Sequence, residues 1–101
     1  MDLDHFKKLN DQYGHLNGDV VLRTLGREIL SCMRREDTFA RFGGEEFVGM
    51  FRATPREQAL GIAEKLRALI ESLEFTTGEE TFRITATFGV ATGPVTGRAA
   101  R

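Results

Sequence analysis

The sequence has few of the residues that cross-link a chain or carry it into a membrane. Cys32 is its one cysteine, which excludes an internal disulfide and a cysteine-rich zinc site and is compatible with the reducing cytosol. No apolar run approaches the about 20 residues that span a bilayer, and the N-terminus lacks the basic-then-apolar order of a signal peptide. We therefore expect a cytoplasmic chain with no membrane segment.

The chain also lacks an excess of either charge. Its 14 basic and 15 acidic residues give a formal net charge of -1, so no overall field attracts nucleic acid or an anionic membrane. Any recognition of phosphate has to be local. With 101 residues, 41% of them hydrophobic, the composition fits one small domain over residues 1–101 with a single core.

Helical periodicity is clear in the first third of the chain. Residues 4–13 have apolar side chains at helical spacing, and Asp4 is well placed to cap that helix. Residues 18–33 form a longer amphipathic pattern. Cys32 falls in step with its apolar face, so we expect this thiol to be buried.

Strand patterns surround a pair of glycines. They predict strands over residues 37–42, 45–52 and 81–93. Between the second and third of these strands, the sequence predicts a helix over residues 55–73, capped by Thr54. Gly43 and Gly44 predict a hairpin turn at positive φ. With a strand ending at residues 1–2, this order predicts an α+β fold, a ferredoxin-like split βαββαβ sandwich with helices packed on an antiparallel sheet.

Carboxylates gather at the predicted strand ends. Asp2 and Asp4 precede the first helix, and Glu45 and Glu46 follow the glycines, so two acidic loops can face each other across adjacent strands. Mg²⁺ takes one or two carboxylates together with water and substrate phosphate, and such a site serves phosphoryl or nucleotidyl transfer. Each piece alone has a plainer interpretation, because short acidic pairs often cap helices and glycine pairs often form hairpins.

Four motifs in order, DLDHFKKLND, YGHLNGD, RFGGEEF and TFGVA, closely resemble the GGDEF family of diguanylate cyclases, with GGEEF as a variant of the signature. The resemblance implies a palm-type domain that joins two GTP molecules into cyclic di-GMP and releases pyrophosphate. It also implies Mg²⁺ or Mn²⁺ as cofactor and, because each chain would hold one GTP, a homodimer.

The resemblance assigns the acidic residues to catalysis. Asp2, Glu45 and the Leu3 carbonyl would bind the metal, and Glu45 would help to deprotonate the ribose 3′-hydroxyl. Glu46 would lie near the phosphates and metals. The two glycines of the hairpin would let the nucleotide approach the backbone.

Other positions match the nucleotide contacts of the family. Asn10 and Asp19 would hydrogen-bond the guanine base, since an amide and a carboxylate can together read the purine edge. The backbone amides of His5 and Phe6 would meet the phosphates at a helix N-terminus, and Lys7 would add a cation.

The stretch RRED, residues 34–37, fits the RxxD product-inhibition motif of the family. Arg34 and Asp37 would bind a guanine and a phosphate of cyclic di-GMP, the arginine through its planar donor fork. The alternative is a charged helix exit that leads into a strand.

The chain departs from the family pattern at both ends. The upstream leader, nearly all of the first strand and a C-terminal helix with basic phosphate contacts have no counterpart in the sequence, so we expect a partial domain with the first strand and last helix largely missing. Asp2 would then be poorly held. Three interpretations stay open: a cyclase, a non-catalytic module that binds GTP or cyclic di-GMP, and a structural dimerisation domain.

Overall fold

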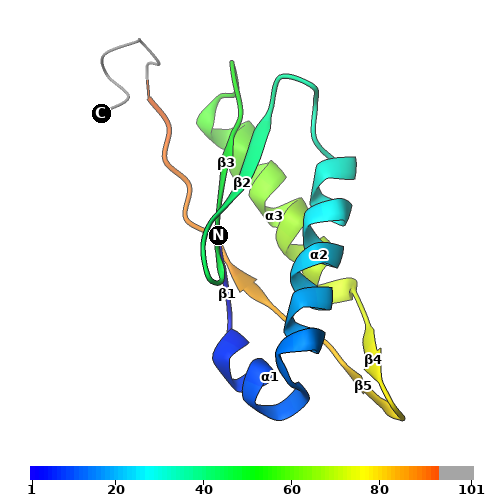
Figure 1. The fold of residues 1–101 in the computed structure, drawn as a ribbon. Coiled ribbons are helices and arrows are strands. Elements are labelled where there is room, and N and C mark those ends of the chain that lie inside the picture. Colours follow the sequence, from blue (N-terminus) through cyan, green and yellow to red (C-terminus); the bar gives the residue numbers. More distant parts are fainter. Residues whose placement is uncertain (94–101) are drawn as a thin grey trace.

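The computed structural model describes residues 1–93 (Figure 1). The helices are α1 (Phe6–Tyr13), α2 (His15–Ser31) and α3 (Arg56–Ser72). The strands are β1 (Asp2–Leu3), β2 (Thr38–Gly43), β3 (Glu46–Met50), β4 (Phe75–Thr77), β5 (Glu80–Phe82) and β6 (Ala86–Thr87). Within the described residues, no helix is both long and apolar enough to cross a membrane.

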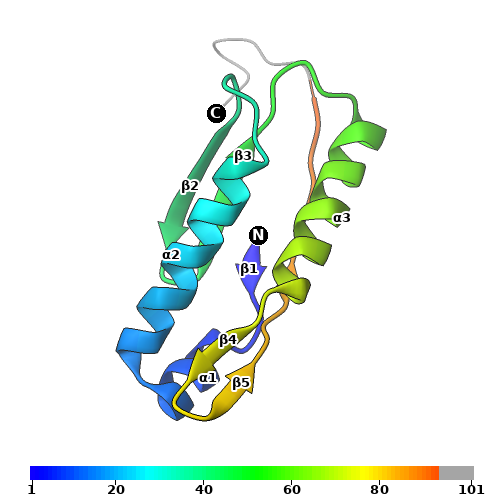
Figure 2. The same cartoon turned by 90° about the vertical axis from the view of Figure 1, so that its right-hand side faces the viewer.

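Four strands form an antiparallel sheet in the order β2-β3-β1-β6. In a split βαββαβ fold the first strand lies inside the sheet and the hairpin lies at one side of it, as it does here. The predicted α+β architecture is therefore confirmed. Figure 2 shows α2 and α3 running lengthwise, with β1 between them in that view.

The core lies between the two long helices and the sheet. Val21, Leu25 and Ile29 of α2 are fully buried, and so is Ile70 of α3. Spacings of three and four residues place such side chains on one stripe of a helix, which is the pattern that the sequence displays. Leu3 from the strand inside the sheet joins the same cluster.

Cys32 is exposed, so the prediction that its thiol is buried is wrong. It is the C-cap residue of α2, just past the last helical turn, with its amide bonded to the Ile29 and Leu30 carbonyls. Met33, the next residue, packs against the core. The periodicity was extended to Cys32, but α2 ends at Ser31, so Cys32 does not belong to the buried face of the helix.

The start of α3 also differs from the prediction. Pro55 rather than Thr54 is the N-cap, and no side chain caps the helix. The Thr54 hydroxyl instead donates a hydrogen bond to the Arg52 carbonyl at 2.9 Å and accepts one from Arg34 at 3.0 Å. These bonds tie it to the preceding loop, so its oxygen does not meet the helix amides.

Residues 81–93 do not form one continuous strand. Phe82, Ile84, Ala86 and Phe88 are more buried than the residues between them, as the alternation predicts. However, β5 pairs with β4 in a separate two-stranded sheet, whereas β6 pairs with β1. The alternation indicated which side chains face inward, but it carried no information about which strand lies alongside.

Truncation of a core leucine will measure how much the fold depends on the helix stripe. We expect Leu25→Ala to lower the free energy of unfolding by about 2–5 kcal/mol, because it removes a fully buried side chain and leaves a cavity. Leu30→Ala on the same helix is the control, since Leu30 is 58% exposed and the change should stay within about 0.5 kcal/mol. Urea denaturation of both variants measures the difference, and equal losses would contradict this account of the core.

Candidate functional site

An open cleft at one end of the sheet brings together most of the predicted metal and phosphate residues. Its lining consists of Asp2, Leu3, Asp4, His5, Phe6, Lys7, Glu45 and Thr87. These residues come from β1, the turn after it, the start of α1, the hairpin turn and β6. The structure therefore joins the two acidic loops as expected.

A larger hollow of about 600 Å³ lies elsewhere, between β3, α3 and residues 88–93. Its lining includes Phe39, Phe51, Leu66 and Phe88 and has no acidic or basic side chain. A carboxylate-bound metal or a phosphate requires charged or polar partners. The chemistry suggested by the sequence therefore belongs to the smaller acidic cleft.

Asp2 is held on both sides by neighbouring strands. It is paired with Glu46 of β3 and with Thr87 of β6. The Phe47 amide donates to the Met1 carbonyl at 2.8 Å, and the Leu3 amide donates to the Glu45 carbonyl at 3.1 Å. The expectation that Asp2 is poorly held is therefore wrong, because strand pairing fixes its backbone.

The hydrogen bonds on either side make Asp2 and Glu46 a non-hydrogen-bonded cross-strand pair, the arrangement in which side chains come closest. Two carboxylates directly opposite each other repel. A cation bound near them would remove this repulsion. Glu46 does not line the cleft itself, whereas the half-buried Glu45 does.

The donor set fits a hard divalent cation that is completed by substrate. Asp2, Glu45 and the Leu3 carbonyl share one cleft. Among residues 1–93, no three His, Cys, Asp or Glu side chains are grouped as a complete metal site. Mg²⁺ is usually bound through one or two carboxylates, with water and substrate phosphate in the other positions.

Asp4 has a different partner from the one predicted. The N-cap of α1 is His5, in the left-handed region at φ 56°, and no side chain caps this helix. The Asp4 carboxylate accepts hydrogen bonds from the hydroxyls of Thr87 and Thr85, each at 2.8 Å. These bonds lower the pKa of Asp4. Asp4 therefore joins the turn after β1 to β6, and its oxygens are already engaged.

Neither threonine was singled out from the sequence. Thr85 and Thr87 alternate with Ile84 and Ala86, which are buried, so their side chains face outward. The alternation in the sequence therefore already indicates that both threonine hydroxyls lie on the same, outward face of the strand. The carboxylate they bind is 81 and 83 residues away in sequence, which no local pattern indicates.

The start of α1 faces the cleft with positive charge. His5, Phe6 and Lys7 all line the cleft. The first amides of a helix have no partners within the helix, and the helix dipole is positive at this end. Lys7 is exposed and adds a full charge. This arrangement suits a phosphate group.

Asn10 and Asp19 lie outside the lining of the cleft, on α1 and α2. Asp19 is exposed and Asn10 is half-buried. The Asn10 Oδ1 atom is buried and has no hydrogen-bond partner among the described residues. Buried polar atoms are normally satisfied, so this one calls for an explanation.

The hairpin turn differs from the prediction in its backbone. The positive-φ glycines among residues 1–93 are Gly14 and Gly78, so Gly43 and Gly44 do not turn the chain that way. Instead, the strand register shifts just before the turn, between Arg41 and Gly43. A β-carbon at Gly44 would meet no atom within 4 Å, so the space beside the turn is open.

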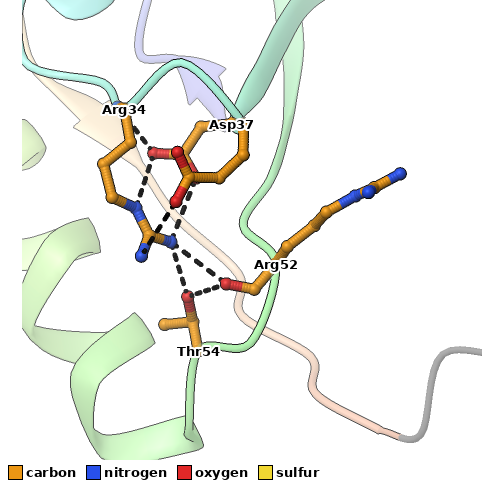
Figure 3. Close-up of polar contacts among 5 residues, drawn as sticks. Arg34, Asp37, Arg52 and Thr54 are labelled. Carbon is orange, nitrogen blue, oxygen red and sulfur yellow. Dashed lines mark hydrogen bonds and ion pairs between the residues drawn. The ribbon is translucent and has the colours of Figure 1, made fainter.

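Arg34 and Asp37 form a network at the other end of the hairpin (Figure 3). Arg34 donates from Nε and Nη2 to the Asp37 carboxylate at 3.3 and 3.1 Å, and its backbone amide donates to the same carboxylate at 2.8 Å. Nη2 also donates to the Arg52 carbonyl at 3.1 Å and the Thr54 hydroxyl at 3.0 Å. The Asp37 side chain is only 3% exposed.

These contacts have two consequences. The Arg34 guanidinium lowers the pKa of Asp37, and Asp37 raises the pKa of Arg34, so the pair stays charged. Arg34 also connects the loop before β2 to the loop before α3, where Ala53 lies in the left-handed region at φ 50°. The predicted motif residues are therefore together, and they already make a structural contact.

Comparisons with known proteins agree on one family. The family model described as "Diguanylate cyclase, GGDEF domain" matches residues 1–101. The chain is 40% identical over 91 residues to Diguanylate cyclase A of Treponema denticola, covering 90% of this chain and 24% of that protein. It is 43% identical over 90 residues to Diguanylate cyclase DgcP of Pseudomonas aeruginosa, covering 89% and 13%. The chain therefore spans a quarter or less of these two relatives.

Solved structures give the same result. The GGDEF domain of DgcB from Caulobacter crescentus, in complex with c-di-GMP, has a TM-score of 0.78 and 32% identity, with coverage of 83% of this chain and 51% of that one. The active GGEEF domain of a diguanylate cyclase from Vibrio cholerae has a TM-score of 0.75 and 36% identity, with coverage of 83% and 53%.

Acid titration will test the bonds between Asp4 and the two threonines. Because folding lowers the pKa of Asp4, the bonds stabilise the fold above the pKa of an unfolded aspartate, about 3.9, and this contribution is lost as pH falls through the lower folded-state pKa. We expect Thr85→Val/Thr87→Val to be less stable than wild type at pH 7, by up to about 1 kcal/mol for each bond. The difference in unfolding free energy between wild type and this variant should become smaller as the pH falls into the acid range.

Urea denaturation at pH 7 and at successively lower pH measures this gap. Thr81→Val is the matched control, since Thr81 is an exposed threonine on β5. A gap that stayed constant down to full protonation of Asp4 would show that the hydroxyls stabilise the fold in some other way.

Proposed function

The chain belongs to the GGDEF family of diguanylate cyclase domains, and we propose that it joins two GTP molecules into cyclic di-GMP with release of pyrophosphate. The observation that carries this proposal is the shared cleft, in which two acidic loops meet a helix N-terminus and a lysine. Carboxylates for a cation and amides for phosphate are what nucleotidyl transfer requires of a protein.

Asp2, Glu45 and the Leu3 carbonyl would hold Mg²⁺ or Mn²⁺. The bound ion would neutralise charge on the phosphate oxygens and promote ionisation of the attacking hydroxyl. Glu45 accepts the proton of the ribose 3′-hydroxyl, which its half-buried position at the cleft supports. Glu46 lies opposite Asp2 and strengthens the negative field that attracts the cation.

The rest of the nucleotide is held by groups around the cleft. The amides of His5 and Phe6 and the Lys7 ammonium bind the phosphates and orient them for attack. Asn10 and Asp19 hydrogen-bond the guanine base. The Asn10 Oδ1 atom is buried, so its contact with the base is assigned to the Nδ2 amide group, which can donate to a guanine acceptor.

Catalysis requires two chains. Each chain has one acidic cleft among its described residues and would bind one GTP there, whereas the product contains two linked nucleotides. Two chains therefore face each other with one GTP each, and the 3′-hydroxyl of each nucleotide attacks the α-phosphate of the other. At chain concentrations below the dimer dissociation constant, specific activity rises with concentration.

The role of Glu45 can be tested by a substitution that keeps its shape. We expect Glu45→Gln to reduce cyclic di-GMP formation from GTP and Mg²⁺ by about a hundredfold or more, because the amide neither holds a cation as well nor accepts the proton. Glu79→Gln, at an exposed turn between β4 and β5, should retain wild-type activity. Product is quantified by chromatography at several chain concentrations.

The outcomes separate the possible errors. Wild-type activity in Glu45→Gln would overturn the assignment of this residue. No product from folded wild-type protein at any concentration would overturn cyclase activity for this chain and leave nucleotide binding as the alternative. A structural dimerisation domain would show no ligand response in wild type, Glu45→Gln or Asp19→Ala.

We also propose that Arg34 and Asp37 bind cyclic di-GMP. Their bidentate pairing supports this, since the buried Asp37 carboxylate holds the planar Arg34 guanidinium, whose side chain is 42% exposed, at the surface. The Nη1 atom of Arg34 contacts only Glu36, at 3.7 Å, among the residues described, which leaves donors for a ligand. The related DgcB domain was solved with c-di-GMP.

Calorimetry with cyclic di-GMP tests this second site. Arg34→Ala should weaken binding tenfold or more, because a charged, bidentate contact is lost. Arg35→Ala is the matched control, an exposed arginine next in the chain. Thermal unfolding of Arg34→Ala is measured in parallel, because Arg34 also joins two loops. Unchanged affinity in a folded Arg34→Ala would refute the site.

A further inference from the structure

Gly18 is a buried glycine at the contact between α2 and α1. A β-carbon built on it would lie 1.9 Å from Asn10 Oδ1, 3.0 Å from Asn10 Cγ and 3.4 Å from Phe6 Cζ. Carbon and oxygen atoms that are not bonded cannot approach to 1.9 Å. The Asn10 amide therefore occupies the space in which every other amino acid carries its β-carbon.

A second glycine in the same helix provides a comparison. A β-carbon at Gly26 would meet no atom within 4 Å. Glycine is less favourable than alanine inside a helix, so both positions weaken α2. At Gly26 there is room for a side chain, whereas at Gly18 the Asn10 amide fills the space that a side chain would need.

The contact holds Asn10 by shape rather than by hydrogen bonds. Its Oδ1 atom is buried against Gly18 and has no partner among the described residues. With Oδ1 closed off against Gly18, the Nδ2 group at the other end of the amide is the donor that a ligand can use. Asp19 follows Gly18 directly in the chain, so the same turn of α2 supports one proposed base contact and carries the other.

We propose that Gly18 is a positioning residue for base recognition, because it gives the Asn10 amide its place between the two helices. The inference rests on the proposed function, in which Asn10 binds guanine. Any larger side chain at position 18 displaces the amide. Affinity for guanine nucleotides and discrimination against adenine nucleotides are then lost, since recognition depends on polar groups placed to match one base.

The test compares Gly18→Ala with Gly26→Ala. Calorimetry with Mg²⁺ measures binding of GTP and of ATP to each folded variant. We expect Gly18→Ala to weaken GTP binding about tenfold or more and to reduce the preference for GTP over ATP. Gly26→Ala should bind both nucleotides as wild type does and have a higher melting temperature.

A double-mutant cycle shows whether Gly18 acts through Asn10. In the Asn10→Ala background the clash is absent, so adding Gly18→Ala should leave GTP affinity unchanged and should raise the melting temperature. In the wild-type background, Gly18→Ala should raise the melting temperature by a smaller amount or lower it. The thermal part of the cycle needs no ligand, so it tests the contact even if Gly18→Ala alone folds poorly.

Each result is decisive. Wild-type GTP affinity in Gly18→Ala, an equal loss of GTP and ATP binding, or additive effects in the cycle would overturn the positioning role. Absence of GTP binding by the wild-type chain would overturn the proposed function and with it the role in recognition. A non-additive thermal cycle would then still establish the packing contact, so the two failures are distinguishable.

Discussion

The pairing of β1 between β3 and β6 is the constraint on which both the core and the candidate site depend. This strand has two residues, and they face opposite ways, as consecutive strand residues must. Leu3 is buried in the core, while Asp2 lies on the other face opposite Glu46 and Thr87. The hydrogen bonds that attach the strand to β3 also set the distance between the two acidic loops. Loss of the pairing would therefore have two effects at once: Leu3 would leave the core, and the proposed metal ligands would move apart.

The two aspartates of DLD differ because of what surrounds them. Asp4 accepts hydrogen bonds from Thr85 and Thr87, which satisfy its charge without a cation. Asp2 faces Glu46 across the strands, and this repulsion favours a bound cation. The same residue type thus serves two purposes: Asp4 fixes the turn after β1, and Asp2 is available for the proposed metal. The two aspartates flank Leu3 equally in the sequence, but the side chains that surround them in the fold differ.

Local patterns in the sequence were enough for the helices, the hairpin and the α+β architecture, because burial of an apolar face requires a period of 3.6 or 2. The meeting of Asp2 and Glu45 in one cleft was also predictable, since strand ends at one edge bring their loops together, whereas Leu3 was assigned only through the family resemblance. The bonds from Asp4 to the threonines and from Arg34 to Thr54 were not predictable, because they join segments far apart in the chain. The exposure of Cys32 was missed because a period indicates a face and says nothing of where the helix ends.

The two ends of the proposed nucleotide site are built by different physical means. The phosphate end depends on hydrogen-bonded strand pairing, which fixes the backbone and sets the positions of charged groups. The base end depends on close packing of α1 against α2, where the missing side chain of Gly18 admits the Asn10 amide. Packing is sensitive to volumes as small as one methyl group, whereas charge acts over longer distances. Substitutions in the helix contact should therefore change which base is selected, while substitutions at the strand ends should change whether the phosphates react.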